Sequence, residues 1–464
     1  MKRLELMPTD ENILTSLKED IFKRNQDLGY FIQLLDSIEG PYSIAINGSW
    51  GSGKTFFVKQ AKMVLDAYNK DFNMPEMKRF MIKGLIQFPK QKLKNQYCIY
   101  YDAWKNDSNL DPIYSLICSI VAGYEYFNKS GLEDKKYLIE VGISIIKNII
   151  PYIPNSAIRT MLSILPLDKI KDALKNTNPL SNVKEHIELE EKIQEFLQNL
   201  SSEKEERLVI FVDELDRCRP DFAVQLLERI KHYFDLENIT FVFSVNCEQL
   251  VHTIQKFYGE NFDAGRYLGR FFDQVVPLPE AKLRKFYKIH DIDEMYFCDM
   301  TIKEFSKSYN FSIRDLVRYI NMSQALVKRI KNTQLIQAAV YPDMEWLLSN
   351  CIIPVMIGIN IFEPQNYNAF ISGEREKEFV QFVGNMWYVD RIHKVVVTPD
   401  SKGCVKEYAD TASELGAIYQ ALFGKENEGL EVSVGNYFFT DSVRTYVRSA
   451  GSLLSGISDF DSHS

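Results

Sequence analysis

Uninterrupted apolar runs along the chain predict the buried strands of a parallel sheet. Four such runs occupy residues 42–46, 97–101, 207–212 and 239–245. Strands whose two faces are both covered by helices carry apolar side chains at successive positions, without the alternation of a half-exposed strand. The runs therefore predict one sheet with helices on both sides.

Segments with helical spacing lie between and around these runs, at 13–35, 55–68 and 112–124. Alternating strands and helices predict an α/β fold, a three-layer sandwich around a mostly parallel sheet. Helical spacing continues from 321 to about 339, and residues 346–361 read as an apolar helix. Residues 394–398 and 430–434 have strand-like patterns and predict strands.

The spacing of these elements predicts an insertion in the core. Far more chain separates the second apolar run from the third than a three-layer core needs. We therefore divide the chain into the first part of the core (1–126), a helical insertion (127–205), the rest of the core (206–285), a helical lid (286–340) and a carboxy-terminal accessory domain (341–464).

A glycine-rich loop joins the first apolar run to the next helical segment. Glycines permit the positive φ and the close approach with which successive backbone N–H groups surround a phosphate. The order of strand, loop and helix favours a nucleoside triphosphate site over a chance turn. The candidate binding residues are Gly48, Ser49, Trp50, Gly51, Ser52, Gly53, Lys54, Thr55 and Phe56.

Two side chains of this loop have predicted chemical roles. Lys54 would bring its ammonium to the β- and γ-phosphates, and Thr55 would offer its hydroxyl to Mg²⁺. The amino terminus of the following helix would add its dipole. ATP with Mg²⁺ is the expected pair, although the loop accepts the phosphates of ATP and GTP alike.

Two adjacent acids follow the apolar run at 207–212. Asp213, at the strand end, is expected to hold Mg²⁺ through water. Glu214 points to the other side and is expected to orient and deprotonate the attacking water. A plain acidic turn is the simpler alternative, but a phosphate loop in the same chain favours hydrolysis.

A polar residue, Asn246, ends the run at 239–245. It is placed to touch the γ-phosphate or to hold the attacking water, as a sensor residue would. Asn is also a favoured helix N-cap, and a helical segment starts near Glu248. Both roles remain open.

Four motifs in this order resemble the KAP family of P-loop NTPases. They are the phosphate loop with Trp50 inside it, Tyr-Asp-Ala-Trp-Lys at 101–105, Asp-Glu-Leu-Asp-Arg-Cys at 213–218, and Tyr-Leu-Gly-Arg at 267–270 leading to Pro-Leu-Pro at 277–279. Glu214 stands where the family has a second Asp, and Asn246 where it often has an Asp. The resemblance covers roughly residues 25–321.

The resemblance implies an ATP-binding switch of the additional-strand, AAA-like or STAND-like kind, often bacterial and often associated with membranes or with defence against phage. It also implies roles for two arginines. Arg314, at the start of the lid helix, would contact the γ-phosphate. Arg270 would be an arginine finger that reaches the nucleotide of a neighbouring subunit. Each is otherwise a surface arginine or part of an ion pair. Asp216 and Arg217 are expected to brace the turn after the strand.

Composition bounds the remaining possibilities. The chain has 464 residues, of which 45% are hydrophobic, and can bury large cores. Its seven cysteines are scattered without a Cys-x-x-Cys pair, which predicts neither a disulfide framework nor a zinc site. Mg²⁺ held with the nucleotide is the only metal expected. The first residues do not read as a secretory signal, and a reducing cytoplasm is the expected location.

Two segments raise the question of other partners. Residues 138–164 are apolar but interrupted by charges and prolines, which favours a packing or interfacial helix over a membrane span. Basic residues at 78–94 alternate with aromatic ones, which fits a solvated connection or a local nucleic-acid contact; the net charge of −8 argues against general nucleic-acid binding.

Three functions follow from these patterns. The main prediction is an ATP-hydrolysing conformational switch, a homo-oligomer that shares its nucleotide sites. The family resemblance adds the expectation of an anti-phage system that responds to a protein effector or a phage-derived trigger. The second is a scaffold that holds ATP for stability. The intact Glu214 argues against it, because a scaffold needs no general base. The third is a membrane-surface organiser that uses residues 138–164.

Overall fold

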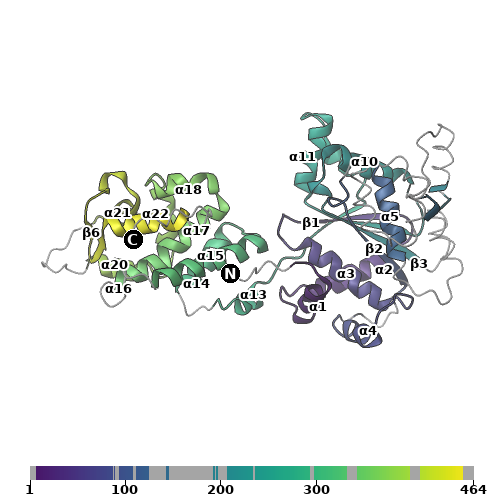
Figure 1. Cartoon of the computed structure of the whole chain (residues 1–464), viewed down its shortest axis with the longest axis horizontal. Helices are drawn as coiled ribbons and strands as arrows, with labels where there is room; N and C mark the ends of the chain where they lie inside the picture. Colours follow the sequence, from purple (N-terminus) through teal and green to yellow (C-terminus); the bar gives the residue numbers. More distant parts are fainter. Residues whose placement is uncertain are drawn as a thin grey trace, which may run out of the picture. The chain divides into compact units, whose positions relative to one another are not determined.

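Two units make up the chain in the computed structural model (Figure 1). The first is Met7–Leu283, and the second begins at Arg284. The structure describes residues 7–86, 88, 93–107, 111–124, 143–145, 192–193, 195–196, 206–233, 236–292, 297–331, 342–397 and 408–452.

A five-stranded parallel sheet forms the centre of the first unit. Its strands are β1 (Tyr42–Asn47), β2 (Asn95–Asp102), β3 (Glu206–Asp213), β4 (Ile239–Val245) and β5 (Gln274–Pro277). They lie in the order β2-β3-β4-β1-β5. The four predicted strands are confirmed, while β5 is too short and too exposed to stand out in the sequence. The strand β4 lies between β1 and β3, so the ends of these three strands meet at one edge of the sheet.

Alternate side chains of the strands enter two separate cores. Ile44 and Ile46 of β1 pack with helices on one face, and Ala45 packs on the other. The first layer contains α1 (Asp10–Glu19), α2 (Asn25–Ser37), α3 (Lys54–Tyr68) and α4 (Glu76–Lys83). The second contains α5 (Pro112–Tyr124), α10 (Pro220–Tyr233), α11 (Cys247–Tyr258) and α12 (Ala264–Leu268). Figure 1 shows α2 and α3 on one side of the sheet and α5, α10 and α11 on the other. The predicted α/β arrangement is confirmed.

The prediction of one helix over 13–35 is wrong, because the segment forms the two helices α1 and α2. The chain turns between them, where Asp20 and Lys23 have left-handed φ values of 44° and 57°. The Asp20 carboxylate accepts a hydrogen bond from the Asn25 N–H at 3.2 Å and so starts the second helix. Apolar periodicity continues across the turn, which is why the sequence does not reveal it.

The basic connection at 78–94 is more ordered than a solvated linker, since α4 occupies its first part. Arg79 is buried, and its guanidinium donates hydrogen bonds to the carbonyls of Ala67, Asn69 and Phe72. This arginine therefore fastens α4 to the end of α3 rather than facing a partner. Lys90 and Lys92 lie outside the described residues.

Most of the predicted insertion, 127–205, and nearly all of the apolar segment at 138–164 also lie outside the described residues. The few residues of 127–205 that the structure describes are helical. Three of them, Ile145, Ile193 and Phe196, are buried in the core beside α5.

The second unit is mainly helical. It contains α13 (Arg284–Ile289), α14 (Phe297–Ser308), α15 (Ile313–Lys331), α16 (Pro342–Leu347), a π-helical turn (Leu348–Ile352), α17 (Ile353–Phe362), α18 (Pro364–Ile371), α19 (Glu376–Gly384), α20 (Val389–Val397), α21 (Thr411–Phe423), β6 (Val432–Val434), β7 (Tyr437–Phe439) and α22 (Asp441–Ser452). The helices α14 and α15 both pack on α17. The segment predicted as a lid therefore shares a core with the segment predicted as an accessory domain.

One stretch of the second unit, Pro342–Phe362, is long and apolar enough to cross a membrane by length and composition. Within the unit it is largely buried, and 67% of its apolar window is covered by protein. That burial is typical of the central helix of a folded core.

The prediction of a strand at 394–398 is wrong where the structure describes it, because α20 runs through residue 397. Ile392 and Val396 are buried on one face of this helix, four residues apart. Three consecutive valines favour a strand locally, but packing of that face decides the conformation. The other predicted strand, at 430–434, is confirmed for Val432–Val434, which pairs with β7.

A buried arginine holds the end of the second unit together. Arg444 is 1% exposed, and it donates hydrogen bonds to the carbonyls of Ala421, Leu430 and Phe439. We expect Arg444→Met to lower the free energy of unfolding by about 3 kcal/mol or more, since it leaves buried acceptors without donors. Hydrogen–deuterium exchange at α21 and α22 would show this loss. The more exposed Arg448→Met should cost less, and equal protection of α21 and α22 in wild type and Arg444→Met would contradict the prediction.

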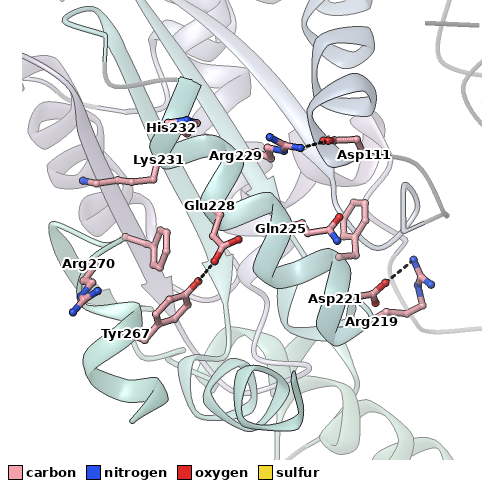
Figure 2. A pocket seen from close by; sticks show the side chains of 12 residues that line it. Asp111, Arg219, Asp221, Gln225, Glu228, Arg229, Lys231, His232, Tyr267 and Arg270 are labelled. Carbon is pink, nitrogen blue, oxygen red and sulfur yellow. Dashed lines mark hydrogen bonds and ion pairs between the residues drawn. The ribbon is translucent and has the colours of Figure 1, made fainter. Parts of the chain in front are cut away.

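An open groove of about 990 Å³ runs along α10 in the first unit (Figure 2). Most of its charges are paired: Arg229 contacts Asp111 at 2.7 Å, and Glu228 accepts a hydrogen bond from Tyr267 at 3.0 Å. Arg270 lies at its edge and forms no salt bridge within the described residues.

Candidate functional site

The phosphate-binding loop begins where β1 ends, beside the ends of β3 and β4. Gly51 and Gly53 have φ values of 75° and 94°, a region that side chains with a Cβ rarely adopt. Gly53 precedes α3, whose first N–H groups therefore border the loop. These are the backbone features that anion binding requires.

Lys54 folds back over the loop that precedes it. Its Nζ donates to the Gly48 carbonyl at 2.6 Å and to the Ser49 carbonyl at 3.1 Å. Burial lowers the pKa of this ammonium, while the charges of Asp216 and Asp213 oppose that shift. The ammonium therefore has neutral loop carbonyls as its hydrogen-bond acceptors. A phosphate in the loop would be a stronger acceptor than these carbonyls.

Asp213 ends β3 next to the equivalent residue of β2, Asp102. Its side chain is buried and oriented by two hydrogen bonds: Tyr100 Oη donates to Oδ2 at 2.8 Å, and the Glu214 N–H donates to Oδ1 at 3.0 Å. Burial, followed by the charge of Asp213, strongly raises the pKa of Tyr100, so its hydroxyl stays a donor. The carboxylate is thus fixed at the edge of the sheet where the phosphate loop lies.

The site fits Mg²⁺ only together with a nucleotide. No group of three or more His, Cys, Asp or Glu side chains in the described ranges is arranged to hold a metal ion. Mg²⁺ commonly keeps several waters and is bound through one or two protein oxygens plus substrate phosphates. The hydroxyl of Thr55 and the carboxylate of Asp213 are oxygen donors of this type.

Glu214 adopts a strained backbone conformation. Its φ of 61° is left-handed, which costs a residue with a Cβ about 1 kcal/mol and is concentrated at functional sites. The side chain forms an ion pair with Arg217, with Nη1 and Oε2 3.0 Å apart. Burial raises the pKa of Glu214, opposed by Arg217 and supported by Asp213.

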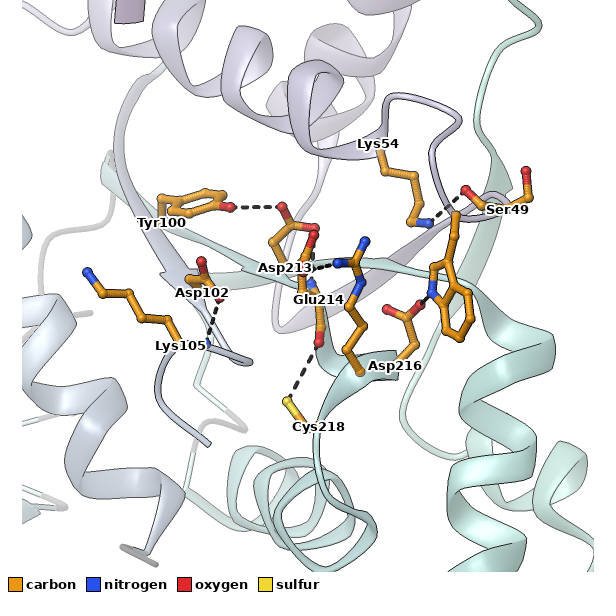
Figure 3. A network of polar contacts seen from close by, with 11 residues as sticks. Ser49, Lys54, Tyr100, Asp102, Lys105, Asp213, Glu214, Asp216 and Cys218 are labelled. Carbon is orange, nitrogen blue, oxygen red and sulfur yellow. Dashed lines mark hydrogen bonds and ion pairs between the residues drawn. The ribbon is translucent and has the colours of Figure 1, made fainter. Parts of the chain in front are cut away.

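The turn after β3, Leu215–Arg217, connects this acid to the phosphate loop (Figure 3). The indole Nε1 of Trp50 donates a hydrogen bond to Asp216 Oδ2. The Arg217 guanidinium lies 5.5 Å from the centre of the Trp104 ring, within range of a cation–π contact. Both tryptophans of the sequence motifs therefore contact the acidic turn.

Asn246 acts as the N-cap of α11, since its Oδ1 accepts a hydrogen bond from the Gln249 N–H at 3.3 Å. The capping alternative is thus confirmed. A sensor role would use the amide nitrogen, which has no hydrogen-bond acceptor in the part of the chain described, and this role stays a prediction.

The remaining predicted residues lie at several places. Phe56 is half-buried against the layer of α1–α4. Arg270 is exposed in the groove along α10, whose lining includes no residue of the phosphate loop. Arg314 belongs to the second unit, in the first turn of α15. Finger and sensor duties for these two arginines stay predictions.

Comparison with known families supplies the next observation. The model of the KAP family P-loop domain matches residues 29–337, more than half of the chain. The chain belongs to the KAP family. The resemblance that the motifs indicated is confirmed, and with it membership of a P-loop class whose members typically bind nucleotide. A search of curated proteins finds no match.

Two residues of this KAP site were missed in the sequence. Tyr100 fixes Asp213, and only the pairing of β2 with β3 brings them together. Arg24 donates to the Ser52 carbonyl of the loop at 3.0 Å, and burial lowers the pKa of its guanidinium to about 10. Arg24 follows the unexpected turn between α1 and α2, so the predicted single helix concealed it.

Proposed function

We propose that this KAP domain binds ATP with Mg²⁺, hydrolyses it to ADP and phosphate, and changes conformation with the state of the nucleotide. The observation that carries the proposal is the contact between the phosphate loop and the acidic turn after β3. Trp50 of the loop donates a hydrogen bond to Asp216, which lies in that turn after Asp213 and Glu214. A loop that cradles phosphates beside an ordered carboxylate pair supports phosphoryl transfer to water.

Each residue has a defined part in the proposed reaction. The loop N–H groups and Lys54 would hold the β- and γ-phosphates, while Thr55 and Asp213 would hold the metal. Bound Mg²⁺ supplies charge that offsets the negative charge developing on the phosphates. Glu214 accepts a proton from water as the water oxygen bonds to the γ-phosphorus and the bond to the ADP oxygen breaks.

The strand order supports assignment to the additional-strand class. In that class a strand separates the strand before the phosphate loop from the one that carries the acids, as β4 does here. AAA-like and STAND-like domains of this class pass the nucleotide state to a helical lid. We assign that role to α13–α15 and, through their shared core, to the rest of the second unit.

The proposal includes oligomers in which Arg270 reaches the nucleotide of a neighbouring copy. Arg270 is exposed, unpaired by any salt bridge within the described ranges, and in a groove without phosphate-loop residues. We expect turnover per subunit to rise with wild-type concentration and Arg270→Ala to lower the plateau at least about tenfold. ATP affinity should be unchanged.

Arg266→Ala is the matched control, because Arg266, on α12 just before Arg270, is also exposed but lies outside the groove. Phosphate release, measured over a range of protein concentrations, distinguishes a shared site from independent subunits. Turnover per subunit that never varies with concentration, or a fully active Arg270→Ala variant, would exclude a shared site.

The ion pair between Glu214 and Arg217 favours a second candidate function. A paired carboxylate is a poor base, so the domain could hold ATP for stability and turn over little. Binding without turnover at any concentration would support this scaffold. We extend the first proposal to a cytoplasmic switch in anti-phage defence, whose trigger is a protein effector or a phage component.

A further inference from the structure

Arg217 has no part in the reaction outlined above, yet it pairs with one of the groups that do. Its guanidinium is 3.0 Å from the Glu214 carboxylate, and the two side chains are 25% and 21% exposed. The ion pair therefore places the guanidinium next to the proposed base.

Contacts with two tryptophans hold the turn that carries Arg217. Asp216 accepts the hydrogen bond from Trp50 inside the phosphate loop, which keeps the turn beside that loop. On the other side, the Trp104 ring lies next to the guanidinium. A guanidinium held against a ring keeps its planar donors in a defined orientation, at a lower entropic cost than a free side chain.

The present partner of Arg217 interferes with catalysis. A guanidinium favours the charged form of a carboxylate and occupies the oxygen that would accept a proton. A carboxylate carries one negative charge, whereas the terminal phosphate of ATP offers three acceptor oxygens with more charge. An Arg guanidinium can bind two oxygens of either group, so the greater charge of the phosphate makes it the stronger partner.

We infer that Arg217 exchanges partners during the catalytic cycle: it pairs with Glu214 when nucleotide is absent and with the γ-phosphate when ATP is bound, which releases Glu214 to act as the base. This inference rests on the proposed function. Arg217 then acts as a γ-phosphate sensor within its own subunit. ADP, which lacks that phosphate, leaves the ion pair in place.

The test is a comparison of Mg²⁺–ATPγS and Mg²⁺–ADP affinities by calorimetry. Arg217→Gln should weaken ATPγS binding roughly tenfold and leave ADP binding unchanged, since only the γ-phosphate loses a charged donor. Glu214→Gln should strengthen ATPγS binding roughly threefold, because no ion pair has to be broken, and should leave ADP unchanged. In the double variant the gain from Glu214→Gln should disappear.

Arg219→Gln is the matched control. This neighbouring arginine pairs with Asp107 at 2.9 Å, away from Glu214, and its loss should not alter the preference for ATPγS over ADP. A wild-type preference in Arg217→Gln, or an equal effect of Glu214→Gln with and without Arg217, would overturn the inference. If Arg217→Gln no longer binds ADP, the Glu214→Gln single variant decides, and equal ATPγS affinity to wild type overturns it. Failure of the wild type to bind either nucleotide would instead refute the proposed function.

Discussion

Lys54→Ala is expected to weaken ATP binding by at least about 100-fold. The ammonium is the only side-chain cation of the loop and lies over the Gly48 and Ser49 carbonyls, where the phosphates would be bound. Charge-assisted hydrogen bonds to two phosphates contribute about 1.5–3 kcal/mol each, and about 2.7 kcal/mol corresponds to a hundredfold change in affinity. Calorimetry with Mg²⁺–ATP measures the effect directly.

Lys78→Ala is a suitable control for this substitution. Lys78 lies partly exposed on α4, and its loss removes the same charge from the chain without touching the phosphate loop. ATP binding by Lys54→Ala with wild-type affinity would show that the loop does not bind phosphates.

Glu214→Gln is expected to lower ATP turnover by about 10²- to 10⁴-fold while ATP stays bound. The substitution keeps the size and the hydrogen-bonding shape of the side chain but removes the oxygen that accepts a proton, and general bases contribute about this factor. Burial raises the pKa of Glu214 and so strengthens its affinity for that proton. Single-turnover phosphate release, with enzyme in excess over ATP, isolates the chemical step.

Glu237→Gln provides the comparison for Glu214→Gln. Glu237 is an exposed acid just before β4, at the opposite edge of the sheet from the site. Its substitution should leave turnover within about twofold, as surface substitutions usually do. Equal turnover by Glu214→Gln and wild type would remove Glu214 from the chemistry.

The sequence predicts those parts of the molecule that local pattern determines. Strands buried on both faces have continuous apolar runs, and β1–β4 appear where these runs lie. The phosphate loop is equally readable, because Gly51 and Gly53 must adopt positive φ and few other residues can. The acids after β3 follow from the same logic, since they terminate a buried strand.

The rest of the site depends on contacts between distant segments. Tyr100 meets Asp213 only through the register of two strands, and Arg24 reaches Ser52 only because α1 and α2 are separate helices. The sequence suggests a bracing role for Arg217 but not its pairing with the predicted base. That pair depends on the left-handed conformation of Glu214, which no residue preference in the sequence indicates.

Phosphate release from Mg²⁺–ATP by the purified chain tests the central claim most directly. It should be measured at several protein concentrations, with Lys54→Ala and Glu214→Gln as blanks. We predict turnover by the wild type, near-background release by both variants, and a rate per subunit that rises with concentration. Release by the wild type no faster than by the two variants, at every concentration and with ATP bound, would contradict the claim that this KAP domain is an ATPase by itself.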